Sequence, residues 1–151
     1  MTKIEKRRRR MENLSLIGLV LLCAGLVAPF ANIGSETLLT VFKYVYAAGA
    51  LIYAVARMVN VNAPGDSMRL RRLRRMEMWA GFAFLVGAFF WFYNSYRYPN
   101  VGFSLAVMRD TIMFTLAGAL IQVISSWMIA ARMKKEAEGK GAENKEKKIK
   151  R

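Results

Sequence analysis

The tetrapeptide RRME occurs twice in this chain, at residues 9–12 and again at residues 74–77. Each copy comes directly before a long apolar stretch, which reads NLSLIGLVLLCAGLVAPFA at residues 13–31 and MWAGFAFLVGAFFWFYNSY at residues 78–96. An apolar stretch of about 20 residues is long enough to cross the roughly 30 Å hydrocarbon core of a membrane as a helix. The repeated motif therefore predicts two places where the chain enters a membrane.

Two further apolar runs bring the total to four, and their bounds are Leu14–Ala31, Thr37–Val59, Met78–Tyr96 and Thr111–Ala131. Only helices and closed barrels satisfy the backbone hydrogen bonds in lipid, and barrel strands would be shorter and alternate in polarity. The runs are continuous, and the chain is 55% hydrophobic although it carries 24 basic residues. The sequence therefore predicts an all-α integral membrane protein with four transmembrane helices.

The basic residues predict how the helices are oriented. Six of them precede Leu14, six lie in the segment between the second and third runs including Arg57, and nine follow Ala131. Cytoplasmic loops carry an excess of Lys and Arg, so we expect both termini in the cytoplasm. This asymmetry and the short loops favour a multi-pass protein of the plasma membrane, specifically a bacterial inner membrane.

The chain divides into five segments on this reading. A basic N-terminus (residues 1–13) precedes a first transmembrane hairpin (14–59), and a basic connector (60–76) leads to a second hairpin (77–133). In the connector, Asp66 or Ser67 is suited to cap a helix that runs directly into the third apolar run. The last segment (134–151) is charged and nearly free of apolar residues, so we expect a frayed helix followed by disorder.

The two hairpins resemble each other at both ends. The second RRME follows the first by 65 residues, and Ala56-Arg57-Met58 recurs 75 residues later as Ala131-Arg132-Met133. The pattern favours two tandem hairpins in parallel orientation, the second longer by 10 residues in its outer loop. Chance similarity of short basic motifs is the alternative that the sequence leaves open.

The motif also predicts ion pairs within each hairpin. A glutamate in the first turn and an arginine in the last turn of a helix both suit the helix dipole. Glu12 begins the outgoing helix of the first hairpin and Arg57 ends the returning one; Glu77 and Arg132 take the same places in the second. We therefore expect the pairs Glu12–Arg57 and Glu77–Arg132.

The returning helices carry a stripe of polar and small residues. In the fourth run the stripe is Thr111, Thr115, Gly118, Gln122 and Ser125, and the equivalent face of the second run is Glu36, Thr40, Lys43, Ala47, Ala50, Ala54 and Arg57. Spacings of three and four residues place each set on one helix face. Small faces let membrane helices approach closely, so we interpret the stripes as a packing seam between the returning helices.

A polar pathway or ligand site is the alternative interpretation of these stripes. Its candidate residues are Glu36, Thr40, Lys43, Thr115, Gln122 and Ser125. Lys43 keeps this alternative open, because ionisable residues inside membrane spans are rare and often functional. It could instead extend to the membrane surface. Gly118 takes the position equivalent to Lys43, and we expect it to leave room for the lysine side chain.

The composition argues against catalysis and cofactor binding. The chain has no histidine and a single cysteine, Cys23, which excludes histidine metal sites, bis-histidine haem and an internal disulfide. No nucleophile–base pair or phosphate-binding loop is visible, so we expect no enzyme activity, no metal and no cofactor.

The net charge of +14 is better explained by anionic lipids than by nucleic acid, because the basic clusters flank the spans. The arginines expected to contact anionic lipid are Arg7, Arg8, Arg9, Arg10, Arg69, Arg71, Arg72, Arg74 and Arg75.

Two classes of function remain. The first is a small scaffold or accessory subunit that packs against itself or against a larger membrane protein. The second is a small transporter or channel, which would act as an oligomer because four spans enclose little space, with a polar path lined by the second and fourth helices.

Overall fold

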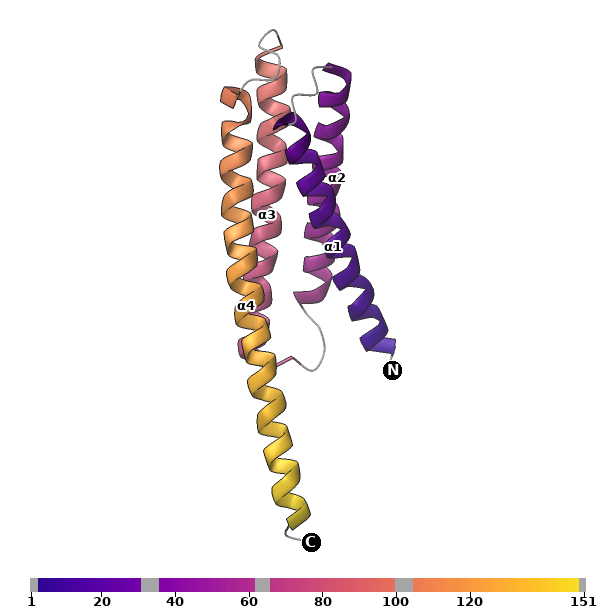
Figure 1. Cartoon of the computed structure of the whole chain (residues 1–151), viewed down its shortest axis with the longest axis vertical. Coiled ribbons are helices and arrows are strands. Elements are labelled where there is room, and N and C mark those ends of the chain that lie inside the picture. The colour runs from indigo at the N-terminus through magenta and orange to yellow at the C-terminus, as the bar shows by residue number, and fades with distance from the viewer. Residues whose placement is uncertain (1–2, 31–35, 62–65, 100–104, 150–151) are drawn as a thin grey trace.

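The chain folds into four helices. The structure, a computed structural model, describes residues 3–30, 36–61, 66–99 and 105–149. The helices are α1 (Lys3–Phe30), α2 (Glu36–Val61), α3 (Met68–Arg97) and α4 (Leu105–Ile149), shown in Figure 1. Each contains a segment long and apolar enough to cross a membrane: Glu5–Val27, Thr37–Val61, Met68–Arg97 and Val107–Gly139. The prediction of an all-α chain with four such helices is confirmed.

The helices extend beyond the apolar runs at their charged ends. α1 begins at Lys3 and α3 at Met68, because Arg, Lys, Glu and Met are strong helix formers. Ser67 caps the N-terminus of α3, and its side chain accepts a hydrogen bond from the backbone N–H of Leu70 at 3.3 Å. α3 then runs unbroken into the third apolar run, as the connector sequence predicts.

The C-terminal segment differs from the prediction. We expected disorder after a frayed helical start in residues 134–151, but α4 continues as a helix to Ile149. The segment is rich in Lys and Glu, which have a high helix propensity. The first turns of this extension are also held to the bundle, because Ser67 Oγ donates a hydrogen bond to Glu136 Oε1 at 2.7 Å.

The four helices pack in the order of the chain. α1 packs against α2, α2 against α3, and α3 against α4. Among the described residues, no other pair of helices has Cα atoms within 8 Å of each other. α2 and α3 are therefore central, while α1 and α4 each have one helix within this backbone distance. Both chain termini lie at the same end of the bundle (Figure 1).

The core is centred on α2 and α3, with Leu22 of α1 and Met108 of α4, and aromatic side chains dominate it. Its largest members are Tyr46, Tyr53, Phe84, Trp91 and Met108. Tyr46 packs on Trp91 with ring centroids 5.4 Å apart, and Tyr53 packs edge to face on Phe84 at 5.2 Å. Such ring pairs add to the packing beyond the area that they bury.

Glycines allow α1 and α2 to pack backbone against backbone. A Cβ atom on Gly25 would lie 2.7 Å from Tyr46 Cβ and 2.8 Å from Tyr46 N. A Cβ atom on Gly18 would lie 2.7 Å from Tyr53 N, and one on Gly49 would lie 2.7 Å from Leu22 N. This is the close approach that small residues permit between membrane helices.

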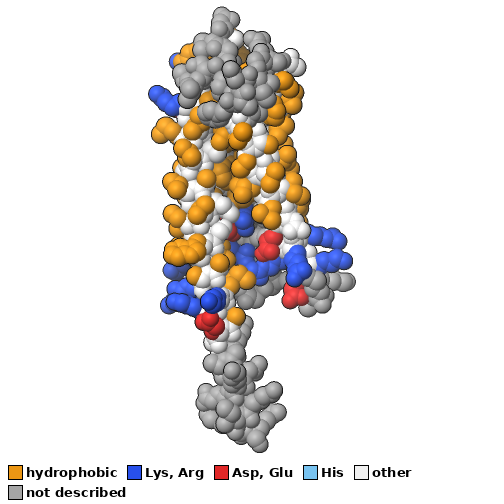
Figure 2. Space-filling view, in the orientation of Figure 1, with side chains coloured by type: hydrophobic (Ala, Val, Ile, Leu, Met, Phe, Trp, Pro, Cys, Tyr) orange, Lys and Arg blue, Asp and Glu red, His pale blue; other side chains and the backbone are white. Residues whose placement is uncertain are grey.

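The surface has a clear division of polarity. Figure 2 shows hydrophobic side chains along the bundle and Lys and Arg side chains gathered near the end that carries the termini. The exposed side chains along the outer helices include Leu16, Ile17 and Val20 on α1 and Leu116, Leu120 and Val123 on α4. A bilayer or the apolar helices of a partner would cover these faces.

Candidate functional site

A set of hydrogen-bonded polar side chains crosses the centre of the bundle. Thr111 Oγ1 on α4 donates to the carbonyl oxygen of Gly87 on α3 at 3.1 Å, and Thr115 Oγ1 donates to the carbonyl oxygen of Thr111 at 2.6 Å. Because the Thr115 proton is used in this way, Tyr46 is the donor in its own 2.6 Å hydrogen bond with Thr115 Oγ1. Each hydroxyl is thus satisfied within the protein.

A second chain of hydrogen bonds links α2, α4 and α3 nearer the charged end. The Tyr53 hydroxyl donates to Gln122 Oε1, and Gln122 Nε2 donates to Ser126 Oγ at 3.0 Å. Ser126 Oγ in turn donates to Glu77 Oε1 at 3.1 Å. The other carboxylate oxygen of Glu77 accepts from Arg57 Nη1 at 2.9 Å, and the Arg57 guanidinium also lies 5.4 Å from the centre of the Tyr53 ring.

Below this chain lies a cluster of ion pairs. Arg74 Nε on α3 contacts Asp66 Oδ2 at 2.5 Å, and both side chains are almost fully buried. Arg8 Nη1 on α1 lies 3.7 Å from Asp66 Oδ1, and Arg8 Nε lies 3.4 Å from Glu12 Oε1. Asp66 therefore bridges arginines of α1 and α3, two helices whose Cα atoms do not come within 8 Å of each other in the described part of the chain.

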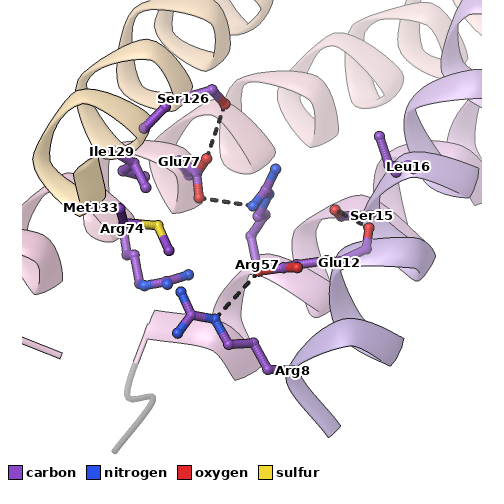
Figure 3. Close-up of a pocket in the computed structure, with 11 residues that line it drawn as sticks. Arg8, Glu12, Ser15, Leu16, Arg57, Arg74, Glu77, Ser126, Ile129 and Met133 are labelled. Carbon is purple, nitrogen blue, oxygen red and sulfur yellow. Dashed lines mark hydrogen bonds and ion pairs between the residues drawn. The ribbon is translucent and has the colours of Figure 1, made fainter. Parts of the chain in front are cut away.

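The cluster surrounds a pocket of about 270 Å³. Figure 3 shows the side chains of Arg8, Arg57, Arg74 and Glu77 arranged around this space. All four helices contribute to its lining, which comprises Arg8, Glu12, Ser15, Leu16, Arg57, Arg74, Glu77, Ser126, Ile129, Ala130 and Met133. Within the described part of the chain, Arg57 Nε and Arg74 Nη2 are buried and have no hydrogen-bond partner.

The ion pairs differ from those that the motif predicts. Arg57 pairs with Glu77 across the two halves of the chain, and not with Glu12 of its own half. Glu12 instead pairs with Arg8 one turn earlier, and Arg132 is exposed while Glu77 bonds Arg57 and Ser126. α2 packs on both α1 and α3, but the Glu77 side chain is 5% exposed and the Glu12 side chain 46% exposed. The pair with Glu77 is therefore less screened by solvent.

The polar stripes also meet differently from the prediction. In α4, Thr111, Thr115 and Ser125 are buried, as a packing seam requires. On α2, Tyr46 bonds Thr115 and Tyr53 bonds Gln122. These long side chains bridge two helices that the prediction brought into close contact. Among the predicted α2 residues, Ala50 and Ala54 are buried, whereas Thr40 is exposed. The Glu36 side chain lies outside the described residues.

Lys43 does not approach Gly118. Its ammonium group lies 4.8 Å from the ring centre of Phe92 on α3 and 5.7 Å from that of Tyr44. A Cβ atom on Gly118 would lie 2.7 Å from Phe84 Cε1, so the space at this glycine is taken by an aromatic ring of α3. The lysine thus makes a cation–π contact with Phe92 of α3.

The arginines predicted to contact lipid fall into two groups. Arg8 is partly buried and Arg74 is buried, and both belong to the ion-pair cluster. The other seven are exposed: Arg7, Arg9, Arg10, Arg69, Arg71, Arg72 and Arg75. A signal for Arg74 was present in the sequence, since Leu70, Leu73, Arg74 and Glu77 recur at the spacing of one helix face.

The hydrogen bond between Tyr53 and Gln122 makes a first testable prediction. Tyr53→Phe should lower the free energy of unfolding by about 1 kcal/mol, because hydrogen bonds between membrane helices are worth roughly 0.6–1.7 kcal/mol. Tyr44→Phe, which alters an exposed tyrosine of the same helix, is the control. Unfolding in mixed micelles followed by circular dichroism measures both, and equal stability of the two variants would contradict the prediction.

Comparison with known proteins supplies no relative on which to base a function. No protein-family model, curated protein or solved structure matches the chain. The functional argument therefore depends on the geometry described above.

Proposed function

We propose that this chain is a non-catalytic integral membrane protein that serves as a scaffold or accessory subunit of a membrane assembly. The observation that carries the proposal is the use of the interior polar groups. Thr111, Thr115, Tyr46 and Tyr53 bond to other groups of the chain, and aromatic rings fill the space between them. Interior polar groups that bond one another specify helix packing.

The same observation weighs against the alternative function. A small transporter or channel would use Thr115, Gln122 and Ser125 to line a polar path. Ser125 Oγ donates to the carbonyl oxygen of Ile121 on its own helix at 2.7 Å, and both Thr115 and Gln122 bond tyrosines of α2. These bonds would have to break before the groups could bind a passing solute.

The proposed membrane orientation has both termini in the cytoplasm, with two tandem parallel hairpins. It is supported by the concentration of Lys and Arg at the end of the bundle that carries the termini (Figure 2). In the described part of the chain, the opposite half of the bundle carries Arg97, Arg109 and Lys43 as its basic residues. We propose that the protein lies in a plasma membrane, specifically a bacterial inner membrane, and that anionic lipids surround its basic end.

The first experiment is native mass spectrometry of the protein released from its own membrane in a mild detergent. The accessory role predicts a stoichiometric complex with a larger membrane protein, or a defined homo-oligomer that serves as a scaffold. A monomer both in the mild detergent and in nanodiscs of the native lipids would contradict this role.

A conductance measurement tests the alternative with Lys43→Met. In the accessory role, the purified chain conducts no ions in planar bilayers, and the variant assembles as the parent does. The variant loses a cation–π contact worth about 0.5–2 kcal/mol, so it should still fold. A conductance that is present in the parent and falls in a folded Lys43→Met variant would instead establish a channel. Val41→Ala, at an exposed residue of the same helix outside the polar stripe, is the control.

A further inference from the structure

We propose that the pocket between α1 and α4 binds the phosphate group of one anionic phospholipid. The inference goes beyond the accessory role and does not depend on it. Two features carry it: buried guanidinium N–H groups that lack partners in the described part of the chain, and apolar side chains in the lining, beside which a lipid chain could leave the pocket.

The floor of the pocket is built to donate hydrogen bonds. Arg74 is nine-tenths or more buried, its Nε is committed to Asp66, and its Nη2 has no partner in the described part of the chain. Arg57 Nη1 is committed to Glu77, and Arg57 Nε likewise lacks a partner. Leaving a buried donor unsatisfied is unfavourable, and the effect is larger for a charged group. A phosphate group has several oxygens with which to accept from both arginines.

The charge around the pocket favours an anion over a cation. Glu12, Asp66 and Glu77 each pair with a guanidinium group, so their negative charge is already offset. Beyond them, α1 and α3 carry seven exposed arginines that add positive potential: Arg7, Arg9, Arg10, Arg69, Arg71, Arg72 and Arg75. Basic pockets between membrane helices are where anionic headgroups bind.

The walls of the pocket favour a lipid over a free anion. Leu16 on α1 and Ile129 and Met133 on α4 line it together with the charged residues. α1 and α4 have no Cα atoms within 8 Å of each other among the described residues. The pocket therefore lies at a gap between these two helices. A volume of about 270 Å³ holds a headgroup, while the acyl chains would lie on the exposed apolar faces.

The test compares phosphatidylglycerol with phosphatidylcholine on the purified full-length chain. Native mass spectrometry with each lipid at the same mole fraction should show one phosphatidylglycerol retained per chain at energies that remove phosphatidylcholine. Arg74→Gln should reduce the retained fraction about tenfold, which corresponds to the loss of a charge-assisted hydrogen bond. Arg72→Gln, which removes the same charge from an exposed site on α3, should retain lipid as the parent does.

A second pair of variants leaves every ion pair in place. Ala130→Trp fills the mouth of the pocket, whereas Ala131→Trp places the same ring beside it on the exposed surface. Only Ala130→Trp should lose the phosphatidylglycerol, and circular dichroism should show both variants folded. Equal loss in the two tryptophan variants, or equal retention of the two lipids, would overturn the proposal.

Inorganic phosphate separates the two sources of the same chemistry. Phosphate at millimolar concentration should not displace the lipid, because it makes no apolar contact. If it displaces phosphatidylglycerol as well as unlabelled phosphatidylglycerol does, the pocket binds a free anion and the lipid assignment is overturned.

Discussion

Glu77→Gln is expected to lower the free energy of unfolding by about 3–5 kcal/mol, the usual effect of removing one partner from a buried ion pair. Glu77 is 5% exposed and Arg57 13% exposed, so solvent does little to screen the pair. The variant leaves the Arg57 guanidinium buried without its carboxylate. The Glu77 carboxylate also accepts a hydrogen bond from Ser126, the last in the series of hydrogen bonds that begins at Tyr53. The substitution removes the negative charge of this acceptor.

The matched control for this prediction is Glu12→Gln. Glu12 is 46% exposed in its pair with Arg8, and exposed pairs contribute at most about 1 kcal/mol. Equilibrium unfolding in mixed micelles measures both variants. The comparison also distinguishes the two possible partners of Arg57, because a pair between Glu12 and Arg57 would make Glu12→Gln the more harmful change. Arg57→Glu should be rescued by Glu77→Arg, and should not be rescued by Glu12→Arg.

Gly25→Ala is expected to destabilise the packing of α1 on α2 by about 1–3 kcal/mol, the range found when a methyl group is forced into a well-packed interior. The new Cβ atom would lie within 3 Å of three atoms of Tyr46, two of which belong to the backbone. Backbone atoms cannot rotate away, so the helices would have to separate. Tyr46 would then move from its hydrogen bond with Thr115 and its contact with Trp91.

Gly139→Ala is the control for the glycine prediction. A Cβ atom at this position meets no atom within 4 Å, so the substitution should leave the stability of the bundle unchanged and raise helix propensity locally by up to about 1 kcal/mol. The same unfolding measurement applies to both glycine variants. Equal stability of Gly25→Ala and the parent would show that α1 and α2 are farther apart than described.

The sequence determined the features that depend on residues close together in the chain. Four apolar runs long enough to span a membrane predicted four helices, because in lipid a helix is one of the few structures that satisfy all backbone hydrogen bonds. Asp66 or Ser67 was the predicted cap of the third helix, and Ser67 caps α3. The spacing of Thr111, Thr115 and Ser125 predicted one face of α4, and that face is buried. Each of these inferences needs only local chemistry and a helical period.

Only the tertiary structure decided which helices contact one another, and hence which charges pair. The RRME motif placed Glu12 and Glu77 equivalently, yet Arg57 pairs with Glu77, which is 5% exposed, while the 46% exposed Glu12 pairs with Arg8. The same packing brings Tyr46 and Tyr53 to the α4 stripe, turns Lys43 toward Phe92, and buries Arg74 beside Asp66. The spacing of residues along a helix shows which side chains share a face. Which helix packs against that face depends on the arrangement of all four helices.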